Sequence, residues 1–200
     1  MRSTFVLAGL LLLALTGLGT GCSSVSSSQV ANPTYQAWAN FEPGSSVTFK
    51  GTRKIGQDTH NVQFTRKLLE VTPQQVVLER SEELLDGSGL PPTVKRDVEL
   101  ARIEPADNPW TNPQARVKDL GDDSIQIKGK TLQCKGKEVV LHVEFGEPLP
   151  TTEDALHRKW VNPEIPGGTV KMFLDRKSTS HDVELSIQAI EYQVVRRKTQ

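Results

Sequence analysis

Apolar residues recur at every second position through most of the chain from Val47 onward. Val47 and Phe49 alternate with polar residues, and Val62 and Phe64 do the same. A period of two places side chains on alternate faces of a strand, whereas a helix repeats near 3.6. The pattern therefore predicts about eight to ten half-buried antiparallel strands. The later alternating positions are Val76 and Leu78; Val94, Val98 and Leu100; Leu132 and Cys134; Val139, Leu141, Val143 and Phe145; Val170, Met172 and Leu174; and Val183, Leu185, Ile187 and Ala189.

Turn-forming residues separate these segments. Residues 86–92 and 105–113 are rich in Gly, Pro and Asp, and Lys128-Gly129-Lys130 is a hairpin signal. The segment from Trp160 to Lys171 carries two prolines and a glycine pair, which predict a rigid turn before a strand that begins at Thr169. Since no long amphipathic segment separates consecutive strands, the chain is expected to be mainly β. A curved antiparallel sheet or a partly open barrel fits this pattern.

One short helix is predicted before the first strand. Asn32 is a suitable N-cap, and Pro33 suits the first helical position. Tyr35, Trp38 and Phe41 follow at near-helical spacing, so we expect a helix over residues 33–40 whose aromatic side chains pack on the sheet. The fold class is thus β-rich α+β.

The N-terminal region has the features of an export signal. Arg2 precedes an apolar run from Phe5 to Leu18, which is shorter than the roughly 20 residues that span a membrane. Small residues then lead into Cys22. We predict a signal peptide over residues 1–21, a Ser-rich tether over 22–31, and a single β-rich domain over 32–200.

Charge and cysteine content indicate which partner is not expected and where Cys134 lies. Without residues 1–21 the chain keeps 23 of its 24 basic residues against 24 acidic ones. It has no basic surplus or stripe, so nucleic acid is not an expected partner, and the basic run at 196–198 fits a solvated chain end. Cys134 has no second cysteine in the domain and alternates with polar neighbours, so it is expected in the core.

No residue pattern indicates catalysis, a metal or a cofactor. The four histidines, His60, His142, His157 and His181, are far apart in the sequence, and His142 falls on a polar face where solvent exposure is expected. Ser180, His181 and Asp182 are triad residue types, but consecutive residues on a turn diverge, whereas a triad needs converging geometry. The protein is not expected to be an enzyme.

The signal region resembles the lipobox of bacterial lipoproteins. Thr20, Gly21 and Cys22 match its pattern, while Gly19 stands where the family usually has Leu. The resemblance implies that Cys22 becomes the acylated mature N-terminus, with chains such as palmitate holding the protein on a membrane. Ser23, where some lipoproteins carry Asp, implies the bacterial outer membrane, facing the periplasm.

The domain itself resembles a family of uncharacterised bacterial lipoproteins. The resemblance lies in the segments from Trp38 to Val47, from Gly129 to Gly136 and from Trp160 to Lys171. The Pro-Gly-Gly turn before Lys171 is also distantly similar to lipoprotein carrier and sorting proteins. That second likeness implies a curved sheet packed on helices around an apolar cavity.

Two functions follow as hypotheses. The first is a non-catalytic, lipid-anchored envelope protein that presents its β-domain to another envelope protein or to the envelope itself. The alternative is a periplasmic module that binds or carries a lipid or a small apolar ligand on its concave face. Trp160, Pro166, Gly167 and Gly168 are candidates for a partner or ligand lip. An apolar cavity near Trp38, Trp110 or Trp160 would favour the alternative, and a filled interior the first hypothesis.

Overall fold

The computed structural model describes residues 28–87, 89–145, 151–177 and 182–195. The predicted signal peptide, the predicted lipidation site Cys22 and most of the predicted tether lie outside the described residues. Ser180, His181 and the basic run at 196–198 lie outside them too.

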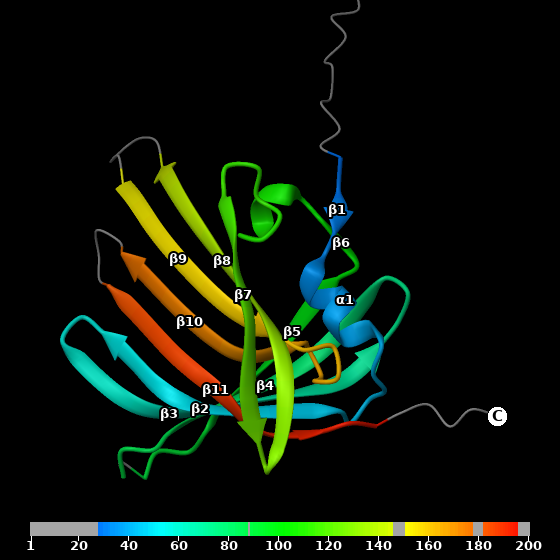
Figure 1. Cartoon of the computed structure of the whole chain (residues 1–200). Helices are drawn as coiled ribbons and strands as arrows, with labels where there is room; N and C mark the ends of the chain where they lie inside the picture. The colour runs from blue at the N-terminus through cyan, green and yellow to red at the C-terminus, as the bar shows by residue number, and fades with distance from the viewer. Residues whose placement is uncertain (1–27, 88, 146–150, 178–181, 196–200) are drawn as a thin grey trace, which may run out of the picture.

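Nine antiparallel strands form one large curved sheet (Figure 1). Their order is β5-β4-β3-β2-β11-β10-β9-β8-β7, so that two meanders meet where β2 pairs with β11. The edges β5 and β7 do not pair with each other, and the sheet is therefore curved but not closed into a barrel. The strands are β2 (Ser46–Ile55), β3 (Asp58–Val71), β4 (Gln75–Leu84), β5 (Thr93–Leu100), β7 (Arg116–Ile127), β8 (Lys130–Phe145), β9 (Thr151–Val161), β10 (Thr169–Lys177) and β11 (Val183–Gln193).

Three small elements and a helix accompany the sheet. Strand β1 (Val30–Ala31) pairs with β6 (Arg102–Ile103), and a 3-10 turn, η1 (Pro105–Asp107), follows β6. Val30 and Ala31, which were assigned to the tether, are thus paired with β6. Helix α1 (Pro33–Ala39) confirms the predicted helix, because Pro33 starts it and the Asn32 side chain accepts a hydrogen bond from the backbone N–H of Thr34 at 2.9 Å.

The aromatic side chains of α1 pack on the sheet, as predicted. Trp38 is 1% exposed, and Phe41, just after the helix, is also buried. Burying a large aromatic side chain removes enough apolar surface from water to fix a short helix that would be unstable alone. The buried sheet residues of this core include Val47, Phe49, Val62, Leu68, Val76, Leu78, Val170, Ile187 and Ala189.

The β7–β8 hairpin confirms the predicted turn at Lys128-Gly129. Lys128 and Gly129 both adopt positive φ, as a tight hairpin turn requires. Next to the turn, Leu132 and Cys134 are buried, with Cys134 only 1% exposed. The predicted core position of Cys134 is therefore confirmed, and burial raises the pKa of its thiol.

Strand β5 corrects one prediction. Val94, Val98 and Leu100 were expected on the covered face of their strand, but they are 57%, 55% and 52% exposed. β5 is an edge strand, and these residues lie on the outer face of the sheet. Alternation in the sequence located the strand correctly, but it did not show which face the rest of the molecule covers. The other face of β5 carries Thr93, Lys95, Asp97 and Glu99.

Candidate ligand-binding hollow

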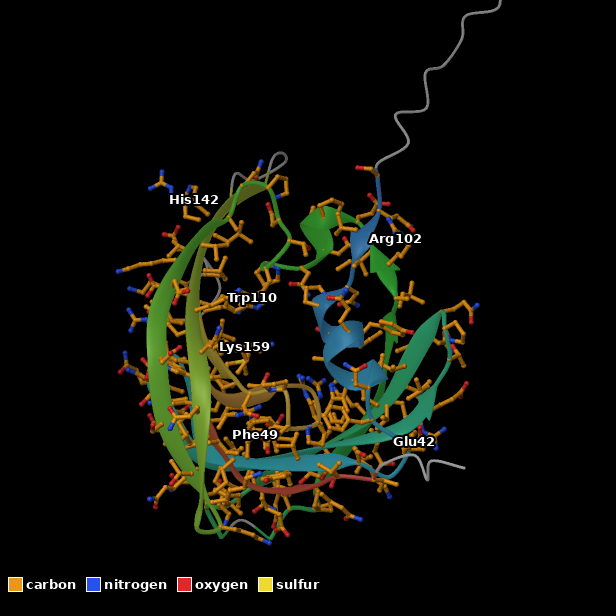
Figure 2. The ribbon with its side chains drawn as sticks, turned by 45° about the vertical axis from the view of Figure 1, so that its right-hand side comes forward. Glu42, Phe49, Arg102, Trp110, His142 and Lys159 are labelled. Atoms are coloured by element: carbon orange, nitrogen blue, oxygen red, sulfur yellow. The ribbon has the colours of Figure 1, made fainter. Side chains whose placement is uncertain are left out.

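The curved sheet and α1 enclose a hollow of about 510 Å³. Its walls come from α1, from the segment between β6 and β7, from strands β7, β8 and β9, and from the turn between β9 and β10. Figure 2 shows Trp110 and Lys159 pointing into the space between β9 and α1, with Phe49 on the floor. The lining residues are Pro33, Gln36, Ala37, Asn40, Phe41, Trp110, Val117, Lys137, Lys159, Val161, Asn162, Pro163, Gly167 and Gly168.

Backbone and side-chain hydrogen bonds hold α1 across the hollow. At one side, Asn32 N–H donates to the Ala101 carbonyl at 3.0 Å, and the Tyr35 hydroxyl donates to the Thr72 carbonyl at 3.0 Å. At the other side, Gly167 N–H donates to the Ala37 carbonyl at 3.2 Å. The helix is therefore fixed both to the β4–β5 half of the sheet and to the turn between β9 and β10.

The turn at residues 162–168 is shaped to receive the helix. Gly167 has a φ of +75°, and a Cβ atom there would lie 2.6 Å from Cε2 of Trp38. Only glycine allows both this backbone conformation and so close an approach to the indole ring. The glycine is thus required by its contact with α1 as well as by the turn itself.

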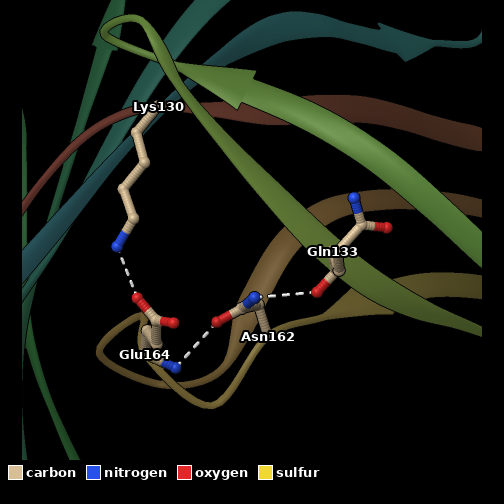
Figure 3. Close-up of polar contacts among 4 residues, drawn as sticks. All are labelled: Lys130, Gln133, Asn162 and Glu164. Atoms are coloured by element: carbon tan, nitrogen blue, oxygen red, sulfur yellow. Dashed lines mark hydrogen bonds and ion pairs between the residues drawn. The ribbon is translucent and has the colours of Figure 1, made fainter.

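Polar contacts tie the same turn to β8 (Figure 3). The Asn162 side chain donates from Nδ2 to the Gln133 carbonyl at 2.8 Å and accepts from the Glu164 backbone N–H at 2.8 Å. Lys130 Nζ lies 2.5 Å from the Glu164 carboxylate. Asn162 is buried, so these hydrogen bonds satisfy polar atoms that water does not reach and hold the turn in one position.

The structure separates the four residues predicted as a lip. Gly167 and Gly168 line the hollow, and Pro166 is buried beside them. Trp160 instead lies on the opposite face of β9 from Lys159, where it faces Gly136 and the Lys171 ammonium, which is 4.7 Å from the ring centroid. Within the predicted lip, the glycine pair reaches the hollow and Trp160 does not.

Trp110 supplies the aromatic wall of the hollow. It follows η1, and its backbone N–H donates to the Asn108 side chain at 2.9 Å. Its ring centroid lies 6.0 Å from Lys159 Nζ, within reach of a cation–π interaction. The prolines around Trp110 indicated a loop from the sequence, and the structure places this loop over the concave side of β9.

Lys159 is a charged lining residue that sequence reasoning missed. It keeps some accessible surface because it lines the hollow, but the surrounding walls shield it from bulk water. Burial, with a smaller effect from the positive charge of Arg66, lowers the pKa of the Lys159 ammonium to about 8. The sequence signal that could have found Lys159 is the alternation of β9. Lys159 shares a face with Val161 and His157, while Trp160 lies on the opposite face.

A second set of cations lies on the neighbouring strands β3, β4 and β5. Arg66 on β3 pairs in register with Arg80 on β4, which pairs in turn with Lys95 on β5. Burial, followed by the charge of Arg80, lowers the pKa of the Arg66 guanidinium, while Asp97 and Glu99 act in the opposite direction. Arg66 and Arg80 line a smaller hollow of about 90 Å³ with Phe49, Phe64, Thr169, Met172, Leu185 and Ile187.

The described histidines do not converge on a site. His142 is exposed, as predicted, and lies 2.5 Å from an Asp154 carboxylate oxygen, while His60 lies 3.4 Å from Asp86. His157 is more enclosed, and burial, followed by the charge of Arg176, lowers its pKa. Within the described ranges, no group of three or more His, Cys, Asp or Glu side chains is placed to hold a metal ion.

Comparisons of the chain with models of protein families, with curated proteins and with solved structures found no match. In the part of the chain that the structure describes, no helix is both long enough and apolar enough to cross a membrane.

Proposed function

We propose that the protein is a non-catalytic, lipid-anchored binding module of the bacterial cell envelope that holds a lipid or another largely apolar molecule in the hollow beneath α1. The single observation that supports this proposal is the hollow itself, at about 510 Å³. Ligand sites generally occupy about 300–1,000 Å³ and combine apolar walls with a few polar groups. The walls here include Phe41, Trp110, Val117 and Val161.

The proposed anchor is the acylated Cys22. Several acyl chains on one residue hold a protein firmly at a bilayer, because each buried methylene contributes roughly 0.8 kcal/mol. Metabolic labelling with a fatty-acid analogue tests this part of the proposal. The wild-type protein is expected to take up label and the Cys22→Ser variant is not, whereas equal labelling of the two would contradict the anchor.

Filling the hollow tests the ligand-binding function. Gln36 is exposed on α1 and lines the hollow, so Gln36→Trp places a large side chain in it without disturbing the core. The uncharged apolar fluorophore N-phenyl-1-naphthylamine is expected to bind the wild-type protein and to bind Gln36→Trp at least about tenfold more weakly, because the added ring occupies ligand space.

The matched control is Gln57→Trp, at an exposed position in the turn between β2 and β3. It adds the same ring outside the hollow and is expected to bind the fluorophore as the wild type does. If the wild type shows no binding, or if Gln36→Trp binds equally well, the proposed function is wrong.

A second candidate function is the presentation of the domain to another envelope protein. The observation in its favour is the exposed apolar side of β5, where Val94, Val98 and Leu100 lie on an edge strand. Contiguous exposed apolar residues often mark interaction surfaces. Native mass spectrometry of the protein from its own membranes separates the two candidates, since a retained lipid supports ligand binding and a stoichiometric protein supports presentation.

A further inference from the structure

We propose that the ligand of the hollow is amphipathic and that its anionic group, a carboxylate or a phosphate, binds between Lys159 and Arg66. This inference depends on the proposed function, because it requires a ligand in the hollow. It adds the chemical class of that ligand and the residues that recognise its charged end.

The charged side chains that line the two hollows are all positive. The larger hollow is lined by Lys137 and Lys159, and the smaller one by Arg66 and Arg80. Among the described residues that line these two hollows there is no Asp or Glu. A cavity whose charged groups all have one sign attracts and orients a ligand of the opposite sign.

Arg66, Arg80 and Lys95 form a row of like charges on neighbouring strands. These three residues lie directly opposite one another on β3, β4 and β5, an arrangement that is unfavourable without a compensating negative charge. Asp97 compensates Arg80, with its carboxylate 3.5 Å from Nε. Asp97 and Glu99 also act on Arg66, but no described carboxylate forms an ion pair with it, so a bound anion would be its first direct counter-charge.

Lys159 lies beside an aromatic ring and away from bulk water. Its described neighbours offer an aromatic ring, that of Trp110, and no carboxylate within ion-pair distance. Keeping an ammonium group away from bulk water without a counter-charge costs free energy, so a bound anion has a large effect there. The positive charge of Arg66 also acts on Lys159, so an anion at Lys159 is attracted by both cations.

Apolar side chains surround both cations and define the rest of the ligand. Phe41, Trp110 and Val161 lie on the side of Lys159, and Phe64 and Met172 lie on the side of Arg66. A small inorganic anion would leave these surfaces without a partner. A long-chain fatty acid or an acidic phospholipid would cover them while its charged end neutralises the two cations.

The test compares a charged ligand with its uncharged form. The probes are a fluorescent long-chain fatty acid and the methyl ester of the same acid, titrated into the wild-type protein. A charge-assisted hydrogen bond contributes enough for at least about a tenfold difference in affinity, so we expect the acid to bind the wild type at least about tenfold more tightly than the ester.

Variants identify the residues responsible. Lys159→Met and Arg66→Met are each expected to weaken binding of the acid at least about tenfold and to leave binding of the ester nearly unchanged. The matched controls are Lys54→Met and Arg96→Met, which remove one exposed cation each from β2 and β5 and are expected to bind the acid as the wild type does. Circular dichroism verifies that each variant is folded.

Each alternative outcome has a definite meaning. Equal binding of acid and ester by the wild type, or unchanged acid binding by both variants, would overturn the anionic preference but leave the proposed function intact. If neither the acid nor the ester binds, both the anionic preference and the proposed function are wrong. Displacement of the acid by an acidic lysophospholipid is expected and would extend the class to lipid headgroups, whereas displacement by inorganic phosphate alone would overturn the amphipathic ligand and indicate a site for free anions.

Discussion

Lys159 is a residue whose charge destabilises the fold that contains it. Burial lowers the pKa of its ammonium from 10.5 to about 8, which means that the folded protein favours the neutral amine more than the unfolded chain does. The positive charge of Arg66 also acts on it, and Lys137 lies in the same lining. A residue of this kind is typical of sites where stability is lost in favour of binding.

The first prediction is that Lys159→Met stabilises the protein in the absence of ligand. Methionine keeps most of the apolar volume of lysine and removes the desolvated charge, so the free energy of unfolding at pH 7 is expected to rise by about 1–3 kcal/mol. Urea unfolding followed by tryptophan fluorescence measures the change. Lys54→Met, at an exposed position, is expected to change stability by less than about 0.5 kcal/mol.

The second prediction concerns pH and follows from the same pKa. Below about pH 8 Lys159 is charged in both the folded and the unfolded state, and the full cost of its burial applies. Between pH 8 and 10.5 the unfolded chain binds more protons than the folded protein, so the contribution of Lys159 to stability rises with pH.

The stability advantage of Lys159→Met over the wild type should therefore shrink between pH 8 and 10.5. Urea unfolding of both proteins across this range measures the difference, in which the titration of the shared residues cancels. An advantage that stays constant with pH would show that the lysine charge is not its cause.

At this scale the sequence predicted the core residues better than the site residues. Trp38 and Cys134 are buried as expected, because periodicity and hydrophobicity both indicate a core position. Lys159 was missed, because a lysine in an alternating strand ordinarily indicates the solvent side. Its inward position depends on curvature of the sheet and on the Trp110 loop, neither of which a local pattern contains.

At the scale of elements, the turn at residues 162–168 and helix α1 form one unit. The helix rests on Gly167 through Trp38 and on Gly168 through Ala37. Asn162 and Glu164 attach the turn to β8. The unit closes one side of the hollow, so the position of the turn determines the shape of the ligand space. The Pro-Gly-Gly segment therefore acts as a support for α1 and as part of the lining.

The third prediction is that Gly167→Ala destabilises this unit. The added methyl group would lie 2.6 Å from the Trp38 ring, and alanine is strained at a φ of +75°. A loss of about 2–4 kcal/mol in the free energy of unfolding is expected, together with weaker binding of the apolar fluorophore. Denaturant unfolding and a fluorophore titration measure the two effects.

Gly87→Ala separates the clash from the backbone strain. Gly87 has a similar φ of +77°, but a Cβ atom there would meet nothing within 4 Å. This control is expected to lose only about 1–2 kcal/mol and to keep full binding of the fluorophore. If the two variants lose the same stability and both bind normally, the contact between Gly167 and Trp38 does not hold the helix.

The sequence predicted both parts of this unit separately. Asn32-Pro33 located the helix, and the prolines and glycines between Trp160 and Thr169 located the turn. It did not predict that they meet, because they are more than a hundred residues apart and no local rule connects them. Trp160 was grouped with Gly167 and Gly168 because all three belong to the segment from Trp160 to Lys171. The alternation of β9 places the Trp160 side chain on the opposite face from Lys159, which lines the hollow.

At the scale of the whole molecule, two meanders share one sheet that stays open. The meander of β2 to β5 contributes Arg66 and Arg80, and the meander of β7 to β11 contributes Lys159 and Lys137. Because β5 and β7 do not pair, the two halves are joined by the β2–β11 pair and bridged by α1 (Figure 1). A ligand that contacts both halves would add a further connection between them.

Such a ligand should stabilise the protein as a whole, which is the fourth prediction. A ligand that binds only the folded state adds about 2.7 kcal/mol at a concentration of 100 times its Kd. In a chain of this size each kcal/mol raises Tm by roughly 2–4 °C, so the long-chain fatty acid is expected to raise the Tm of the wild type by about 5–10 °C. Thermal unfolding followed by circular dichroism measures the shift.

The variants show whether the stabilisation comes from the hollow. At the same concentration of fatty acid, Lys159→Met is expected to show about half the wild-type shift, since tenfold weaker binding removes about 1.4 kcal/mol of stabilisation. Gln36→Trp, with the hollow filled, is expected to show almost none. Equal shifts in all three proteins would mean that the acid binds elsewhere, for example on the exposed apolar face of β5, and the two halves of the sheet would then not be joined through a ligand.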